Sequence, residues 1–223
     1  MNAWRMVVAL GLATALVLTA QAQFNLGKVL NTAGDVVSAV KGVSSETATD
    51  LQSAYVDRLS AAARYKAFAA QAKTNNYVAV QAAFRAAEAS ATIQAKKIAA
   101  LIQSSGATAT GSAAAPVVKT TLENLQSATK SGTAVSRSTY PGFVKKATRK
   151  GDLSAARLFQ QVISSETALV GIFSKASADL AAWKASGAEF AVCPTCGYAV
   201  ETTRSLTTCP VCDAARSTFT SYK

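Results

Sequence analysis

The chain has 223 residues but no histidine. This absence excludes Ser-His-Asp and Cys-His catalysis and any metal site with an imidazole ligand. Proline and aromatic residues are also scarce, with 4 prolines and 7% Phe, Trp and Tyr. Half of the residues are apolar and many of these are alanine, so the composition favours helices packed through small side chains. The length allows one ordinary domain plus a small module.

Residues 1–22 have the pattern of a secretory signal peptide. Arg5 precedes an apolar run from Met6 to Leu18, and Ala20-Gln21-Ala22 offers a small-x-small cleavage site. The run is short for a transmembrane helix, and an uncleaved membrane anchor is the alternative. We therefore expect an exported protein, periplasmic or extracellular, and interpret residues 23–43 as an N-terminal lead.

Acidic residues are few, 12 against 23 lysines and arginines, and the formal net charge is +11. Basic clusters occur at Lys96-Lys97 and at residues 145–150. Such a surface suits an anionic partner, either an acidic redox protein or an anionic component of the cell envelope. The second cluster precedes Gly151, where cations also stabilise the C-terminus of a helix. Nucleic acid is not an expected partner of an exported protein.

Four long stretches have helical periodicity, at residues 46–73, 77–103, 117–150 (with a disturbance at Tyr140-Pro141-Gly142) and 152–186. The second stretch carries a nearly unbroken stripe of inward positions: Tyr77, Val80, Phe84, Ala87, Ala91, Gln94, Ile98 and Leu101. Short turns join the stretches into two hairpins, and a flexible connection at about residues 104–116 joins the hairpins. This predicts a mainly α fold, a ferritin-like four-helix bundle over residues 44–187 with one long crossover.

Residues 188–223 contain every cysteine of the chain, in two Cys-x-x-Cys pairs: Cys193, Cys196, Cys209 and Cys212. Two such pairs can place four thiolates at the corners of a tetrahedron, which selects zinc or iron. The spacing does not separate an iron site from a structural zinc site. Disulfides are the other alternative in an exported protein, although a Cys-x-x-Cys loop is strained for a purely structural bridge.

The residue after each pair matters for the turn. Gly197 follows the first pair and allows a left-handed backbone that opens amides toward sulfur. Asp213 follows the second pair, where another glycine would be expected; aspartate visits this conformation less readily. The pattern therefore predicts a small module of two knuckles around one metal ion.

The module resembles the C-terminal rubredoxin-like domain of rubrerythrins, which implies a small β/knuckle fold. The resemblance rests on Cys-Pro-Thr-Cys-Gly-Tyr, the later Cys-Pro-Val-Cys and Ser217-Thr218-Phe219. Weaker similarities to the family's helices occur upstream in the expected order: Ala63-Arg64-Tyr65 with Phe68-Ala69, Leu122-Glu123-Asn124-Leu125, Tyr140-Pro141-Gly142-Phe143 and Leu158-Phe159. The similarity covers about residues 46–220.

This resemblance implies a bundle with a di-iron site, where peroxide is reduced by electrons supplied through the cysteine-ligated iron. The family builds that site from glutamates and two Glu-x-x-His pairs. The corresponding positions here are Arg58, Ala91, Gln94, Gly132, Val135, Glu166 and Leu169. Of these, Glu166 alone keeps a family ligand. One carboxylate does not supply the donors that two iron ions need, so we expect no di-iron centre and no rubrerythrin-type peroxidase activity.

The helical spacing places both Arg58 and Glu166 on or beside inward stripes. An unpaired buried charge is costly, so we hypothesise that the two form an ion pair in the vacated centre. In the alternative, the Arg58 side chain reaches solvent and pairs with Asp57 or another acid.

Two functions follow from these observations. The first is a non-catalytic metal-binding protein with one iron or zinc ion on the four cysteines. The second is a periplasmic electron-transfer protein that cycles Fe(III)/Fe(II) at that site. A residual peroxide-reducing enzyme ranks third. Rubrerythrins commonly form dimers, so the resemblance also implies a homodimer or larger homo-oligomer.

Overall fold

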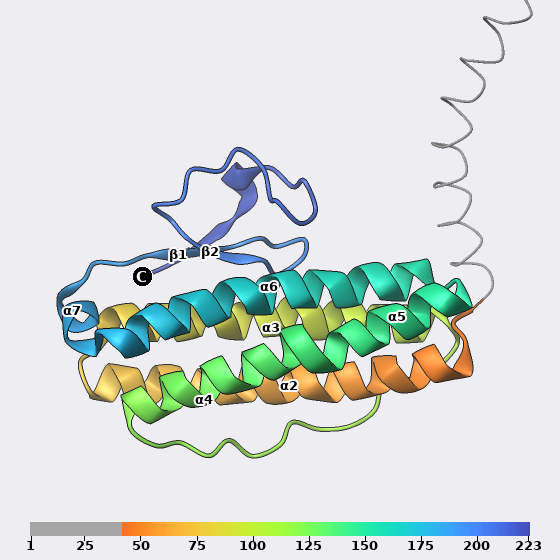
Figure 1. Cartoon of the computed structure of the whole chain (residues 1–223), viewed down its shortest axis with the longest axis horizontal. Helices are drawn as coiled ribbons and strands as arrows, with labels where there is room; N and C mark the ends of the chain where they lie inside the picture. Colours follow the sequence, from red (N-terminus) through yellow and green to blue (C-terminus); the bar gives the residue numbers. More distant parts are fainter. Residues whose placement is uncertain (1–41) are drawn as a thin grey trace, which may run out of the picture. The chain divides into compact units, whose positions relative to one another are not determined.

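The computed structural model describes residues 42–223, so the predicted signal peptide and residues 23–41 of the lead lie outside the described part. Its helices are α2 (Ser45–Thr74), α3 (Val78–Ser104), α4 (Thr121–Ala134), the π-helix η1 (Val135–Thr139), α5 (Tyr140–Lys150), α6 (Leu153–Ala178) and α7 (Leu180–Ala185). Helices α2, α3 and α6 and the combined α4-η1-α5 segment lie side by side as four rods (Figure 1). The predicted ferritin-like four-helix bundle is confirmed.

Helix starts follow side-chain caps. Ser44 caps α2 by accepting from the amide of Thr47. Thr120 and Glu123 form a reciprocal capping box at the start of α4, since each side chain accepts from the backbone amide of the other. The third helix therefore begins at Thr121 and not at residue 117 as predicted, because the residues before this cap lie outside the helix.

The predicted disturbance of the third helix lies about one turn earlier than expected, at η1. The amide of Tyr140 donates to the carbonyl of Val135, five residues back, so the helix widens into η1 just before Pro141. Pro141 is tolerated because it then falls in the first turn of α5. Helix α5 ends at Lys150 with Gly151 in the left-handed conformation, so the second basic cluster occupies a helix C-terminus.

The predicted fourth helix is interrupted. Asp179 has non-helical dihedral angles, φ −141° and ψ 72°, and its side chain accepts from the amide of Ala182 to cap the short helix α7. A residue that caps a new helix has left the preceding one, which is why the single predicted helix is two. Trp183 consequently projects from α7, where its ring stacks on Phe190.

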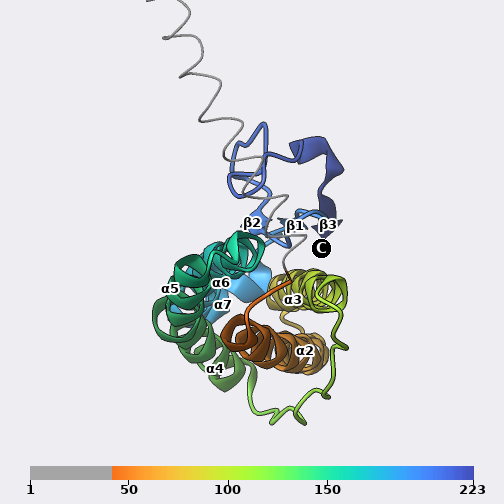
Figure 2. The ribbon, with the colours of Figure 1, turned by 90° about the vertical axis from the view of Figure 1, so that its right-hand side faces the viewer.

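The long crossover is held on the outside of α2 (Figure 2). The Gln52 side chain donates to the carbonyl of Thr108 at 2.6 Å and accepts from the amide of Thr110 at 3.2 Å. Ser60 accepts from the amide of Ala114 at 3.0 Å. These side chains give backbone partners to a segment that has no secondary structure of its own. Within residues 42–223, no helix is long and apolar enough to cross a membrane.

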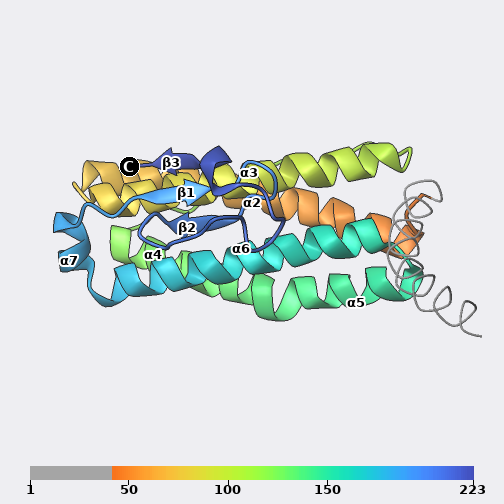
Figure 3. The same ribbon diagram turned by 90° about the horizontal axis from the view of Figure 1, so that it is seen from above.

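The C-terminal module is a three-stranded antiparallel sheet with the order β2-β1-β3, built from β1 (Phe190–Val192), β2 (Ala199–Glu201) and β3 (Thr220–Tyr222), with a 3-10 turn η2 (Arg216–Thr218). Figure 3 shows the sheet over α3 and α6. Side chains alternate along β1 and into the residue that follows it: Phe190 and Val192 join the bundle core, whereas Ala191 and then Cys193 join the cysteine cluster. The strand is therefore shared by both parts of the molecule.

Two apolar clusters fill the bundle, and each rod changes from one to the other near its middle. One cluster contains Tyr65, Phe84 and Phe173, and the other contains Tyr140 and Phe159. Between them lies a set of buried polar residues that we name the central polar layer: Arg58, Ser90, Gln94, Ser165 and Glu166. The bundle core is thus divided by polar groups that need partners within the protein.

Candidate metal centre and the bundle interior

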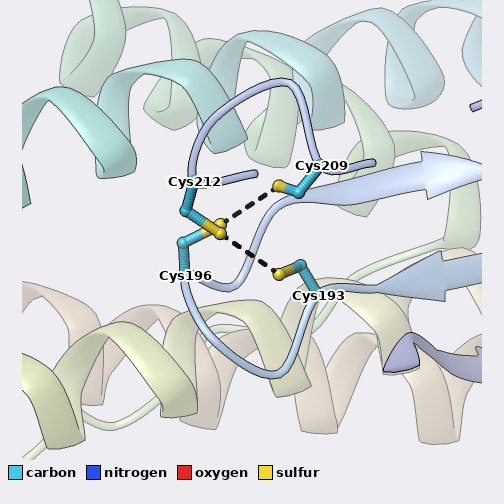
Figure 4. Close-up of side chains that lie close together, drawn as sticks. All are labelled: Cys193, Cys196, Cys209 and Cys212. Atoms are coloured by element: carbon cyan, nitrogen blue, oxygen red, sulfur yellow. Dashed lines mark hydrogen bonds between the residues drawn. The ribbon is translucent and has the colours of Figure 1, made fainter. Parts of the chain in front are cut away.

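The four cysteines converge on one point at the tips of two turns (Figure 4). All four Sγ atoms lie within 4.8 Å of one another, and the Cys193–Cys212 and Cys196–Cys209 pairs are 3.6 Å apart. A tetrahedral zinc site with Zn–S bonds of about 2.3 Å has sulfur–sulfur edges of about 3.8 Å. The donor set and its spacing therefore fit a single tetrahedral metal ion.

The disulfide alternative does not describe this arrangement. The cysteines are free thiols, and 3.6 Å between sulfurs far exceeds the S–S bond length of about 2.05 Å. Among residues 42–223, these four form the one group of three or more potential ligands close enough to share an ion.

The two turns have the same backbone geometry. Gly197 donates its amide to the carbonyl of Cys193 at 2.9 Å, and Asp213 donates to Cys209 at 3.0 Å. Both residues are left-handed, with φ of 79° for Gly197 and 60° for Asp213. Asp213 therefore adopts the left-handed backbone that was predicted for this position, which costs more conformational free energy for aspartate than for glycine.

The thiols differ in how readily they ionise. Burial raises the pKa of Cys196 and of Cys209. Burial also opposes ionisation of Cys193, but hydrogen bonds from the amides of Cys196 and Thr195, together with those from the thiols of Cys212 and Cys196, outweigh it and lower the pKa of Cys193. Amides directed at sulfur stabilise thiolate, which is the form that binds metal.

The seven positions that the resemblance assigned to a di-iron site all lie in the bundle interior. They are Arg58 on α2, Ala91 and Gln94 on α3, Gly132 on α4, Val135 in η1, and Glu166 and Leu169 on α6. Ala91 and Leu169 belong to one apolar cluster and Val135 to the other. What remains at the centre is Arg58, Gln94 and Glu166, with Gly132 beside them.

The structure brings Arg58 and Glu166 together. Nη1 of Arg58 contacts Oε1 of Glu166, and the two side chains are 1% and 2% exposed. Asp57, which is 38% exposed, binds the same guanidinium through Nη2 at 2.7 Å. Arg58 therefore pairs with both acids that the sequence offered as alternatives, and its side chain stays buried.

Two buried tyrosines complete this site, and the sequence patterns did not assign them to it. The hydroxyl of Tyr65 donates to Oε2 of Glu166 at 3.4 Å, and that of Tyr140 donates to Asp57 at 2.9 Å. Burial raises the pKa of both phenols, and the nearby carboxylates raise it further. Both tyrosines stand in motifs noted for the resemblance, but nothing in those motifs identified their partners.

Gly132 gives the Glu166 carboxylate its space. A Cβ atom at position 132 would lie 2.8 Å from Oε2 of Glu166 and 2.8 Å from Cγ2 of Val170. Both distances are shorter than van der Waals contact, so a larger residue here requires Glu166 and Val170 to move.

The fold and the cysteine site define a four-helix bundle protein that carries a mononuclear four-cysteine metal module. The family model described as rubrerythrin matches residues 51–175. The chain belongs to the rubrerythrin family.

Nigerythrin of Nitratidesulfovibrio vulgaris (strain Hildenborough) is 26% identical over 189 residues, which are 84% of this chain and 92% of nigerythrin. A solved structure of nigerythrin in its fully reduced, all-ferrous state superposes with a TM-score of 0.73 at 26% identity, covering 79% of this chain and 86% of that one. A mixed-valence nigerythrin gives 0.70 at 25% identity, covering 81% and 92%. This protein is thus a rubrerythrin-family metal-binding protein with a four-cysteine site.

Proposed function

We propose that this protein is an exported, non-catalytic metal-binding member of the family, in which the four cysteines hold the metal and the bundle holds none. The observation that carries the proposal is the ion pair of Arg58 with Glu166. The guanidinium of Arg58 occupies the position beside the Glu166 carboxylate where a metal cation would bind. The charge of Glu166 is already compensated by a side chain.

The remaining groups around Glu166 do not form a di-iron ligand set. Gln94 offers one neutral amide oxygen, and the tyrosines face the carboxylates as hydrogen-bond donors. Two iron ions would need several anionic oxygens and nitrogen donors, and the chain has no histidine. The residues present therefore do not fit a di-iron centre, and we derive no peroxide chemistry from it.

The proposal of export rests on the N-terminal segment, where Arg5, the apolar run and Ala20-Gln21-Ala22 have the order of a signal peptide. The net charge of +11 supports an anionic partner, either an acidic redox protein or an envelope component. A lysine also stands beside the metal module, because Nζ of Lys97 donates to the carbonyl of Thr195 at 2.9 Å. Oligomerisation, as a homodimer or larger, is carried by the family resemblance.

One observation favours electron transfer as the second candidate. Cys212 is only partly buried, unlike the other three cysteines, so one edge of the site reaches the surface. An iron ion bound there would be accessible to a partner. The metal found in the native protein decides between a redox site and a zinc ion that only stabilises the module.

The test is metal analysis of the protein purified from its native host and from cells supplied with both metals. We expect one metal ion per chain, present as zinc or as an iron site that bleaches reversibly on reduction. Cys196→Ser should abolish metal binding, because Cys196 supplies one of four ligands and is buried. Peroxide consumption should not exceed that of this variant.

Glu166→Gln is the matched control in the bundle, because it changes the charge but hardly the size of the retained family ligand. Its metal content should equal that of the wild type. More than one iron per chain in the wild type, with loss of the additional iron in Glu166→Gln, would show that the bundle holds a metal centre. Zinc alone in the native protein would exclude electron transfer.

A further inference from the structure

A serine of the bundle contacts the backbone that surrounds the metal site. Oγ of Ser165, which is fully buried on α6, donates to the carbonyl of Gly197 at 2.9 Å. That carbonyl and the amide of Tyr198 belong to one peptide group. The amide of Tyr198 is in turn directed at the sulfur of Cys196. One peptide therefore joins a bundle hydroxyl to a metal ligand.

The hydrogen bonds behind Ser165 have a defined direction. Ser165 has a single hydroxyl hydrogen, which is used on Gly197, so it accepts in its 2.9 Å contact with Ser90. Ser90 therefore donates to Ser165 and accepts from Nε2 of Gln94 at 3.3 Å.

The chain of bonds continues to the ion pair. Oε1 of Gln94 accepts from Nη1 of Arg58 at 3.5 Å, which is the longest link. Every donor thus points the same way, from the buried guanidinium through Gln94, Ser90 and Ser165 to the peptide of Gly197 and the sulfur of Cys196.

We propose that the central polar layer tunes the four-cysteine metal site through this one-way chain, with Ser165 as the positioning residue. The inference rests on the proposed function, because it needs metal at the cysteines. A hydrogen bond to a peptide carbonyl polarises the peptide and strengthens the bond that its amide donates. A stronger amide–sulfur bond stabilises the metal–thiolate unit, which raises metal affinity and, for iron, favours the reduced state.

The two turns of the metal site differ in their contact with the bundle. Gly197 lies against the bundle so closely that a Cβ atom would be 2.8 Å from the carbonyl oxygen of Ser90. Asp213, at the equivalent position of the second turn, is exposed. The bundle therefore acts on the first turn, and the second turn provides an internal reference within the same site.

The experiment compares three full-length variants, each loaded with Zn(II) and separately with iron. Ser165→Ala should weaken zinc binding on the order of tenfold, measured by competition with a chelator, and should lower the reduction potential of the iron form. Ser90→Ala should shift both quantities in the same direction by less, because Ser165 keeps its bond to Gly197. Ser90 does not donate to the module, so its effect would report polarisation along the chain of bonds and not loss of a contact.

Ser164→Ala is the matched control, since its hydroxyl bonds only the carbonyl of Gln160 in the same helix. It should behave as the wild type in affinity and potential. Circular dichroism and thermal unfolding of each metal-free variant establish that the bundle is folded.

Equal affinities and potentials for Ser165→Ala and Ser164→Ala, with one metal bound in each, would overturn this inference and leave the proposed function intact. Wild-type protein without metal at the cysteines would overturn both.

Discussion

The bundle centre and the cysteine module both gather side chains from separate segments, yet they differ in what those side chains leave unsatisfied. In the centre, the charges of Arg58 and Glu166 compensate each other, and tyrosine hydroxyls occupy further carboxylate oxygens. In the module, four sulfurs face one another with only weak thiol contacts. In the first region a side-chain cation faces the carboxylates, and in the second four sulfurs surround one point.

Under the proposed function, this difference corresponds to a metal site that has been replaced while the fold is kept. A ferritin-like centre places polar groups in the middle of four helices, where a metal would compensate their charge. Here an arginine supplies the positive charge, glutamine and serines supply neutral hydrogen bonds, and Gly132 supplies space. The polar layer is retained, while the apolar clusters on either side keep the helices packed.

The largest expected effect comes from separating the ion pair. Arg58→Met leaves Glu166 buried and unpaired, and should reduce the free energy of unfolding by about 3–5 kcal/mol. Glu166→Leu should cost less, because Arg58 keeps the partly exposed Asp57. Urea titrations of both variants measure the costs.

The double variant Arg58→Met/Glu166→Leu is the control for this pair. Replacing both charges by apolar groups is often neutral, so its stability should return close to that of the wild type. A double variant as unstable as the sum of the singles would mean that the charges are not coupled. Interactions other than charge compensation would then stabilise the centre.

The cysteine turns and the inward positions of the bundle can be predicted from the sequence, because each depends on residues that are close together in the chain. Each cysteine turn is closed within five residues, so spacing and the following Gly197 or Asp213 determine it. Helical periodicity likewise places Arg58 and Glu166 on inward faces. The docking of the module depends instead on Ser90, Ser165 and Gly197, which are distant in sequence and meet only through tertiary packing. No local pattern carries that information.

A smaller loss of stability is expected when a methyl group is added in the centre, and it tests whether the packing around Glu166 is as close as its charge pairing. Gly132→Ala should lower stability by about 1–3 kcal/mol, because the new methyl group would displace Glu166 or Val170. Gly171→Ala, in the neighbouring helix α6, has no atom within 4 Å of the added Cβ and is the control. Removing a helical glycine there should stabilise by about 0.5–1 kcal/mol. Equal effects of the two substitutions would contradict a close fit at Gly132.

The last expected effect is absent at neutral pH and concerns the two phenols that line the centre. Burial raises the pKa of Tyr65 and Tyr140, so the folded state keeps protons that the unfolded state loses above its pKa of about 10. Their contribution to stability is therefore complete below about pH 10 and declines at higher pH, by up to about 1.4 kcal/mol per pH unit for each tyrosine. Urea titrations from pH 9 upward measure this slope.

Tyr65→Phe should remove one tyrosine's share of the slope, and Tyr65→Phe/Tyr140→Phe should remove both. An unchanged slope in the double variant would show that the phenols ionise as freely in the folded protein as in the unfolded chain, and the centre would then be open to solvent.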